Sequence, residues 1–265
     1  MELKRGLVDY INSELFGRLE GACNIQHLVA ASLVDYFQKT SGVTGSIGEI
    51  GVRDGKLIFG MSFFLESFER CAAIDLFESQ HLNVDMSGFK PESHGNPFEL
   101  HHKSFLPSER WSIVDGDSLG LTLLDKFNLL NECDSFRMFS IDGGHDPEHV
   151  INDMNFVNDL MCSGGVLMID DYYNIGFPGV HEGLLTYLKS LPKWKPFMYS
   201  HNKLFLCTHT YHPIYSVLLE KYVVGNSEYL VQDWYTRKKV RLGGNSFRNV
   251  EWSRSGIGML MTASK

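Results

Sequence analysis

The sequence has 265 residues, of which 43% are hydrophobic and 21% are charged, and its formal net charge is −8 at pH 7. This length is ample for a sizeable core and fits one large α/β domain, or such a domain with a lid. The negative charge, without a visible basic stripe, argues against nucleic acid as a partner, because phosphate backbones are bound by clustered Lys and Arg.

The start of the chain is amphipathic, and no later run reaches the roughly 18 apolar residues that a membrane span needs. We therefore expect no signal peptide and no membrane partner. The cysteines have neither paired nor metal-ligand spacing, which indicates reduced, buried thiols of a cytoplasmic protein. They are Cys23, Cys71, Cys133, Cys162 and Cys207.

Two helical patterns come first, over residues 7–19 and 25–38, with apolar residues repeating at helical spacing. We expect them to form a packing layer on a sheet; a lid over a bound cofactor is the alternative. Residues 40–45 then break the second helix.

Residues 46–55 have the sequence Ser-Ile-Gly-Glu-Ile-Gly-Val-Arg-Asp-Gly, which predicts a short strand and a glycine turn, and a helix is expected over 56–66. Gly48, Gly51 and Gly55 thin the chain so that a ligand can lie against the backbone. Backbone N–H groups at such a turn bind polar ligand groups at the carboxyl end of a strand.

The next expected strand, residues 71–77, carries Asp75 near its end. A carboxylate at this position can accept hydrogen bonds from both hydroxyls of a ribose. The turn and the acid together indicate a nucleoside cofactor.

The glycine spacing distinguishes between cofactors. It does not match the Gly-x-Gly-x-x-Gly of a nicotinamide-dependent oxidoreductase, and Glu49 would repel a pyrophosphate but suits an ammonium and a sulfonium. The turn from Gly51 to Gly55, with Asp75 further on, resembles motif I and the second-strand acid of class I S-adenosylmethionine-dependent methyltransferases. The resemblance implies that Glu49, Gly51, Gly55 and Asp75 bind S-adenosylmethionine; an ordinary β–α turn is the alternative.

A long polar connection, residues 78–110, follows the second strand and contains four histidines without ligand-like spacing, so we expect a solvated loop. The third strand, residues 111–114, ends in Asp-Gly-Asp-Ser. Polar residues at this position are well placed to contact the edge of an adenine base. The resemblance implies that Asp117, together with Ser118, belongs to the cofactor site; the alternative is a helix N-cap before residues 119–124.

An apolar strand beginning at residue 136 stops on Asp142, and two glycines then present His145 ahead of a helix starting near residue 147. A further strand, residues 166–169, ends on Asp170 and Asp171. Parallel strands bring their carboxyl ends to one rim, so the three carboxylates should face the same crevice as the glycine turn. Carboxylates gathered in this way suit Mg²⁺ or another hard divalent ion. The alternative is a strand cap and a histidine that hydrogen-bonds within a turn.

The Ile-Asp-Gly-x-His motif at residues 141–145 and the Asp-Asp pair resemble metal-dependent O-methyltransferases related to macrocin and mycinamicin sugar methyltransferases, over about residues 45–210. The resemblance implies that Asp142, Asp170 and Asp171 hold the metal and that His145 is the base, with Asp142 both catalytic and close to the cofactor. It also implies a Rossmann-like class I methyltransferase fold, a mostly parallel seven-stranded sheet with an antiparallel edge hairpin and helices on both faces.

We therefore expect an S-adenosylmethionine-dependent O-methyltransferase that acts on a hydroxyl of a sugar or glycosylated small molecule, assisted by Mg²⁺ or another divalent ion. Coordination lowers the pKa of the hydroxyl, and a vicinal diol is the expected acceptor shape. A catechol-like or other small-molecule methyltransferase and a non-catalytic nucleoside-binding protein are the alternatives.

The rest of the chain is expected to close the sheet. A Gly/Pro-punctuated aromatic loop over 172–180 precedes a helix over 181–190, and residues 194–200 and 203–208 predict an antiparallel hairpin. A helix is expected over 214–222, before a polar tail that is either a solvated appendage, an oligomer contact or a site for an anionic carrier. The expected units are an N-terminal helical layer or lid (1–44), the cofactor-binding catalytic domain (45–210), and a C-terminal helix with a polar appendage (211–265).

Overall fold

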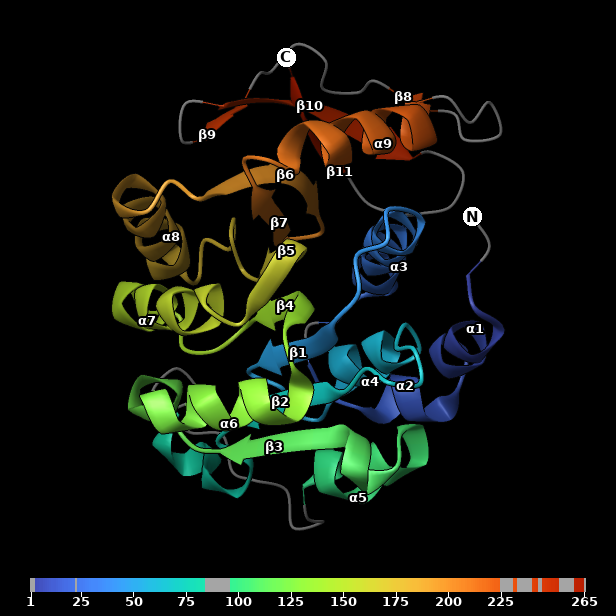
Figure 1. The fold of residues 1–265 in the computed structure, drawn as a ribbon, viewed down its shortest axis with the longest axis vertical. Helices are drawn as coiled ribbons and strands as arrows, with labels where there is room; N and C mark the ends of the chain where they lie inside the picture. Colours follow the sequence, from blue (N-terminus) through green and yellow to red (C-terminus); the bar gives the residue numbers. More distant parts are fainter. Residues whose placement is uncertain are drawn as a thin grey trace.

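The computed structural model describes residues 3–21, 23–83 and 96–224, together with four C-terminal strand segments, and it describes side chains as far as Leu219 (Figure 1). The C-terminal segments are β8 (Val231–Gln232), β9 (Val240–Leu242), β10 (Asn245–Trp252) and β11 (Leu260–Ser264). Most of the expected polar appendage lies outside the described residues.

One sheet of seven strands has the order β3-β2-β1-β4-β5-β7-β6 (Figure 1). Its first five strands are parallel, and β7 runs antiparallel to both of its neighbours. This confirms the predicted fold class. The strands are β1 (Ser46–Ile50), β2 (Cys71–Asp75), β3 (Trp111–Asp115), β4 (Phe136–Ile141), β5 (Met161–Ile169), β6 (Trp194–Ser200) and β7 (Lys203–Thr208).

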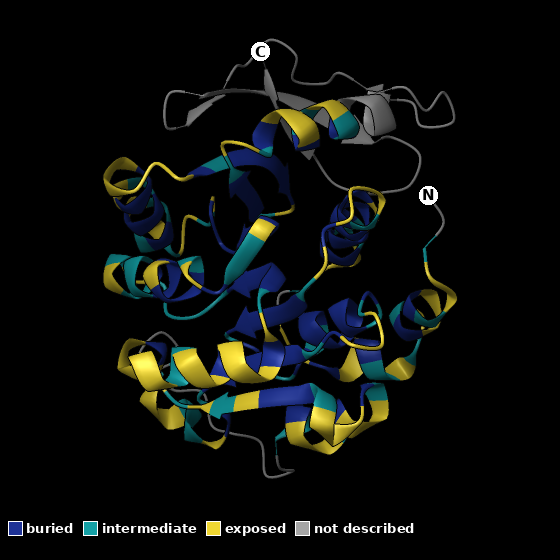
Figure 2. Cartoon of the chain, viewed as in Figure 1, coloured by how far each residue is buried: buried dark blue, intermediate teal, exposed yellow. Residues whose placement is uncertain are grey.

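Helices cover both faces of the sheet, because neighbouring strand residues point to opposite sides. Met138 of β4 joins one buried cluster, with residues of α1 to α5 and α9, whereas Phe139 joins the other, with residues of α6, α7 and α8. Figure 2 shows the central strands mostly buried, with exposed residues on the outer sides of the helices and on the edge strand β3. The helices are α1 (Arg5–Ile11), α2 (Glu14–Arg18), α3 (Ile25–Thr40), α4 (Lys56–Ser62), α5 (Pro97–Phe105), α6 (Leu123–Cys133), α7 (Pro147–Asn158), α8 (Pro178–Ser190) and α9 (His212–Val224).

The chain order of the strands reverses between β1 and β4, and in open α/β sheets a ligand crevice lies at such a point. Backbone hydrogen bonds continue past the strand ends here. Asp142 N donates to Ile50 O at 2.9 Å, and Asp170 N donates to Ile141 O at 3.0 Å. The ends of β1, β4 and β5 therefore form one rigid rim.

Two predicted helices differ in the structure. The first N-terminal helix is broken between α1 and α2, because the Ser13 side chain accepts a hydrogen bond from Phe16 N and starts a new helix. The helix expected over 119–124 begins at Leu123 instead, where Thr122 and Asp125 form a capping box. In both cases local side-chain capping decided the helix boundary.

The long connection expected to be a solvated loop contains α5, with Phe98 and His102 buried. Asn96 caps the helix by accepting from Phe98 N, and Pro97 occupies the first turn. The His102 ring is stacked on Phe98, so this histidine is a core residue. The sequence does contain a helix signal here: an Asn-Pro pair that is followed by apolar residues at helical spacing. Residues 84–95 of the connection lie outside the described residues.

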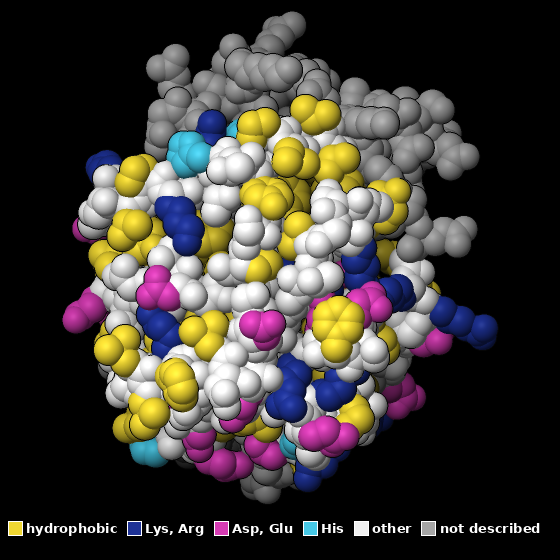
Figure 3. Space-filling model, viewed as in Figure 1, with side chains coloured by type: hydrophobic (Ala, Val, Ile, Leu, Met, Phe, Trp, Pro, Cys, Tyr) yellow, Lys and Arg dark blue, Asp and Glu magenta, His cyan; other side chains and the backbone are white. Residues whose placement is uncertain are grey.

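On the face shown in Figure 3, the described Lys and Arg side chains lie among acidic and apolar ones and form no continuous basic stripe. Within the described part of the chain, no helix is long and apolar enough to span a membrane. The expectations of no nucleic-acid partner and of a possible homo-oligomer remain predictions.

Candidate active site

A cavity of 1220 Å³ opens at the carboxyl ends of the parallel strands. Eight of the residues expected to be catalytic or to bind cofactor or metal line it: Glu49, Gly51, Asp75, Asp117, Ser118, Asp142, His145 and Asp171. Gly55 and Asp170 do not. The structure therefore brings most of the expected site residues to one cavity.

At two glycines of the turn, the space that a Cβ atom would need is filled by other residues of the protein. A Cβ on Gly51, which has φ +81°, would lie 1.7 Å from the carbonyl oxygen of Asp142, so glycine is required where β1 meets β4. Gly55, at φ +89°, is the residue before α4, and a Cβ there would lie 2.6 Å from the Phe59 ring. The Cβ positions of these two glycines are therefore taken by Asp142 and Phe59, and contact of a cofactor with the glycine backbone remains a prediction.

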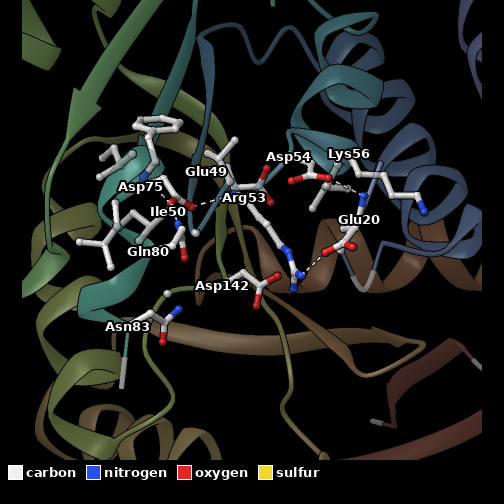
Figure 4. A pocket seen from close by; sticks show the side chains of 18 of the residues that line it. Glu20, Glu49, Ile50, Arg53, Asp54, Lys56, Asp75, Gln80, Asn83 and Asp142 are labelled. Carbon is white, nitrogen blue, oxygen red and sulfur yellow. Dashed lines mark hydrogen bonds and ion pairs between the residues drawn. The ribbon is translucent and has the colours of Figure 1, made fainter. Parts of the chain in front are cut away.

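Asp75 is held rigidly at the end of β2. Its Oδ2 accepts from Arg53 N at 2.7 Å, and its Oδ1 accepts from Phe77 N at 2.9 Å and from the Gln80 amide (Figure 4). Burial raises the pKa of Asp75, and these hydrogen bonds oppose that shift. The carboxylate is fixed at the cavity wall, as an acceptor for ribose hydroxyls requires.

Glu49 is buried in the cavity wall at 2% exposure, and among the described residues its Oε2 has no hydrogen-bond partner. Burial raises its pKa to about 8, with Lys203 acting in the opposite direction. A buried carboxylate oxygen without a hydrogen-bond partner is costly unless a ligand group satisfies it. A cationic group, such as the ammonium of S-adenosylmethionine, fits this position.

The raised pKa of Glu49 predicts how the stability of the protein changes with pH. Its pKa is about 8 when folded against a reference value of 4.5, so between these values the unfolded state binds fewer protons. The free energy of unfolding should therefore fall as the pH rises, by up to about 1.4 kcal/mol per pH unit. Glu49→Gln is expected to flatten this slope, as measured by urea unfolding at several pH values in that window. Equal slopes in the two proteins would contradict the assignment.

Asp117 and Ser118 lie at the cavity wall after β3. The Asp117 side chain accepts from Leu119 N at 3.0 Å and caps the short 3-10 helix η4 (Ser118–Gly120), so the N-cap alternative is what the structure contains. The Ser118 carbonyl accepts from the Asn152 amide at 2.7 Å, which ties η4 to α7. Their contact with adenine remains a prediction.

Asp142, His145 and Asp171 form the chemical centre of the cavity. Each offers one ligand atom, and these atoms lie within 4.8 Å of one another. His145 Nε2 lies 3.2 Å from Asp171 Oδ2, and the His145 ring stacks on Phe177 with ring centroids 3.7 Å apart. Adjacent ligands of an octahedral ion bound at about 2.1 Å lie roughly 3 Å apart. The separation of His145 and Asp171 is close to this value, and the oxygen-rich donor set suits a divalent ion.

Electrostatics favour a cation at this point. Burial and the neighbouring Asp170 carboxylate raise the pKa of Asp142 well above its usual range; a bound divalent ion would reverse that shift. Asp171 is held in the left-handed region at φ +52°. Its Oδ1 accepts from the Asn174 amide at 2.9 Å and from the Asn202 amide at 2.6 Å, so its Oδ2 is aimed at His145.

The structure brings together two of the three expected metal carboxylates, and Asp170 has another partner. Asp170 Oδ2 lies 2.7 Å from Lys203 Nζ, and both side chains are buried. Burial alone would raise the pKa of Asp170, but the ammonium outweighs it and lowers the pKa to about 2. Antiparallel pairing of β5 and β7 sets Ile169 against Leu204, so Lys203 meets Asp170. The signal missed in the sequence was a lysine at the start of an apolar strand.

The N-terminal layer also contributes to the cavity. Leu15, Leu19 and Glu20, from α2 and the segment after it, line its wall, as does Arg53 of the glycine turn. Leu7 and Leu28 of the same layer are fully buried in the core. This layer therefore packs on the domain and also borders the cavity. The two interpretations, a packing layer and a lid over the cofactor, are compatible with this position.

A family model described as a methyltransferase domain matches residues 49–172, which run from the end of β1 past the end of β5 and include Glu49, Asp75, Asp142 and Asp171. Comparison with curated proteins gives no match. This match and the fold identify residues 49–172 as a methyltransferase domain, the catalytic domain of enzymes that use S-adenosylmethionine as methyl donor.

Solved structures with the same fold include the O-methyltransferase NovP, at a TM-score of 0.52 and 15% identity over 70% of this chain and 80% of that one. The calicheamicin methyltransferase CalS11 matches at a TM-score of 0.52 and 16% identity, over 77% of this chain and 90% of that one. An O-methyltransferase from Bacillus cereus, solved with S-adenosylhomocysteine, matches at a TM-score of 0.51 and 14% identity, over 78% of this chain and 91% of that one. At these identities the likeness establishes the fold alone.

Proposed function

We propose that this methyltransferase is a metal-dependent O-methyltransferase that acts on one hydroxyl of a vicinal diol, carried by a sugar or glycosylated small molecule. The observation that carries the proposal is the placement of Asp142, His145 and Asp171 in the same cavity as Glu49 and Asp75, the residues expected to bind the cofactor. A hydroxyl acceptor needs a base and a means of lowering its pKa, and this group of side chains offers both.

The acceptor class has separate support. Two neighbouring hydroxyls can chelate one divalent ion, which would fix the reacting oxygen. A structure of CalS11, named there as a TDP-rhamnose 3′-O-methyltransferase, matches this fold at a TM-score of 0.51, which favours a sugar hydroxyl as the first class to test.

The roles of the side chains follow from their geometry. Asp142 and Asp171 would hold the divalent ion, because hard ions prefer carboxylate oxygens. When bound, the ion supplies Lewis acidity that lowers the pKa of the acceptor hydroxyl. His145 takes the hydroxyl proton; Phe177 fixes its ring plane, and the Asp171 carboxylate 3.2 Å away stabilises the imidazolium. Methyl transfer from a sulfonium is an in-line displacement that the cavity promotes by positioning both reactants.

The first experiment is an isothermal titration of the protein with S-adenosylhomocysteine, in a chelator and again with Mg²⁺. Methyl transfer is then assayed on nucleotide sugars, glycosides and catechol, each with and without chelator. Transfer that requires both a diol and the ion supports the proposal. Cofactor binding with transfer unaffected by chelator would overturn metal dependence, and transfer only to catechol would overturn the sugar acceptor.

His145→Ala separates the role of base from that of metal ligand. If His145 is the base, the variant should lose about 10²- to 10⁴-fold in kcat and keep its affinity for Mn²⁺, measured by electron paramagnetic resonance. Its affinity for S-adenosylhomocysteine should also be unchanged. A parallel loss of Mn²⁺ affinity would assign His145 to the metal instead.

A further inference from the structure

Arg53 has an unusual place in the glycine turn. Its backbone is in the left-handed region at φ +49°, and its N–H donates to Asp75, the ribose acid. Figure 4 shows its side chain extending away from Asp75 to an ion pair with Glu20, and both Arg53 and Glu20 line the cavity. Arg53 therefore extends from the proposed ribose acid to the N-terminal layer at the cavity wall.

The guanidinium group of Arg53 forms an ion pair with Glu20, which follows α2 in the N-terminal layer (Figure 4). The Glu20 backbone N–H in turn donates to Asp54 Oδ2 at 2.6 Å. Glu20 is thus fixed at both its backbone and its side chain to the turn that binds the cofactor. Its carboxylate lies against Arg53 at the wall of the cavity.

The amino-acid end of S-adenosylmethionine carries an ammonium and a carboxylate. Glu49 fits the ammonium, so the carboxylate needs a cation nearby. Three Lys or Arg side chains of the described residues line the cavity. Arg18 pairs with Glu14 in a largely exposed ion pair, and the Lys56 ammonium lies 4.7 Å from the Phe16 ring centroid. Of these three, Arg53 is the one that belongs to the glycine turn, and its own backbone N–H donates to Asp75.

We propose that Arg53 binds the carboxylate of the cofactor's methionine moiety, and that the Glu20 carboxylate occupies that position when the cofactor is absent. Arginine suits this role because its planar guanidinium group binds carboxylates through two parallel hydrogen bonds. The proposal rests on S-adenosylmethionine as cofactor and is independent of the metal and of the acceptor. Binding exchanges one carboxylate partner of Arg53 for another.

This exchange predicts opposite effects for the two members of the ion pair. Arg53→Met removes the cation and should weaken S-adenosylhomocysteine binding about 10- to 100-fold, the range for a lost charge-assisted hydrogen bond. Glu20→Gln removes the competing carboxylate and should tighten binding by about 2- to 10-fold. A merely structural link between the N-terminal layer and the turn would weaken binding in both variants.

Isothermal titration with two ligands tests the proposal. S-adenosylhomocysteine carries the carboxylate, whereas decarboxylated S-adenosylmethionine lacks it and keeps the ammonium. Arg53→Met should lose affinity for the first ligand and keep it for the second, and Glu20→Gln should leave the second unchanged. Arg53→Lys, which keeps the charge without the planar group, should fall between the wild type and Arg53→Met.

The matched controls are Arg18→Met and Glu14→Gln, which break the other ion pair of the N-terminal layer at the cavity wall and should leave both affinities unchanged. Circular dichroism and thermal melting establish that each variant is folded. Equal losses for both ligands, or weaker binding in Glu20→Gln, would overturn the proposal. Absence of S-adenosylhomocysteine binding to the wild type would instead contradict the cofactor assignment.

Discussion

Asp171→Asn is expected to lower kcat/KM for methyl transfer by about 10²- to 10³-fold, because it removes a carboxylate from the proposed metal centre. The substitution is conservative for the fold. Asn tolerates the left-handed backbone of this position, and an amide oxygen can still accept from Asn174 and Asn202 in place of Oδ1. The change is confined to the atom that faces His145, at 3.2 Å.

The measurement pairs steady-state kinetics with Mn²⁺ binding, which should weaken in parallel, and with S-adenosylhomocysteine binding, which should not. Asp146→Asn is the control, because Asp146 is exposed beside the site and its side chain makes no capping hydrogen bond. Asp171→Asn with wild-type transfer and Mn²⁺ affinity would remove Asp171 from the centre.

Arg137→Met should destabilise the protein by about 3–5 kcal/mol, because it leaves buried carboxylates without their cation. The fully buried Arg137 lies near the start of β4, away from the carboxyl-end rim. It contacts Asp35 and Glu69, each at 3.0 Å, and donates to the Gln38 side chain and the Phe64 carbonyl. This cluster ties α3 and the segment before β2 to the centre of the sheet.

Thermal melting should show a drop of roughly 10 °C for Arg137→Met, with S-adenosylhomocysteine affinity unchanged at a temperature where the variant is folded. Adding Asp35→Asn and Glu69→Gln should recover part of the loss, because neutral amides are less costly to bury unpaired than carboxylates. Arg18→Met, which breaks an exposed pair, should change stability little. A small loss in Arg137→Met, unaffected by the added changes, would mean that the cluster is not stabilised by its arginine.

The sequence determined the fold class and most of the site. Alternating apolar runs and glycine turns predict parallel strands, and parallel strands present the residues at their carboxyl ends on one rim. For this reason Asp75 and Asp142 could be assigned to one crevice from their positions after two apolar runs, and both line the cavity. The hairpin of β6 and β7 was predicted from the same kind of local pattern.

The tertiary structure decided which side chains meet. Asp170 and Asp171 are adjacent in sequence, and only the register of β5 against β7 sets Lys203 beside the first and leaves the second facing His145. The contacts of Arg53 with Glu20 and of Arg137 with Asp35 likewise join distant segments. Periodicity and spacing predict the helix or strand to which a residue belongs and the face on which it lies. The partners of a residue across the fold depend on strand register and helix placement, which no local pattern encodes.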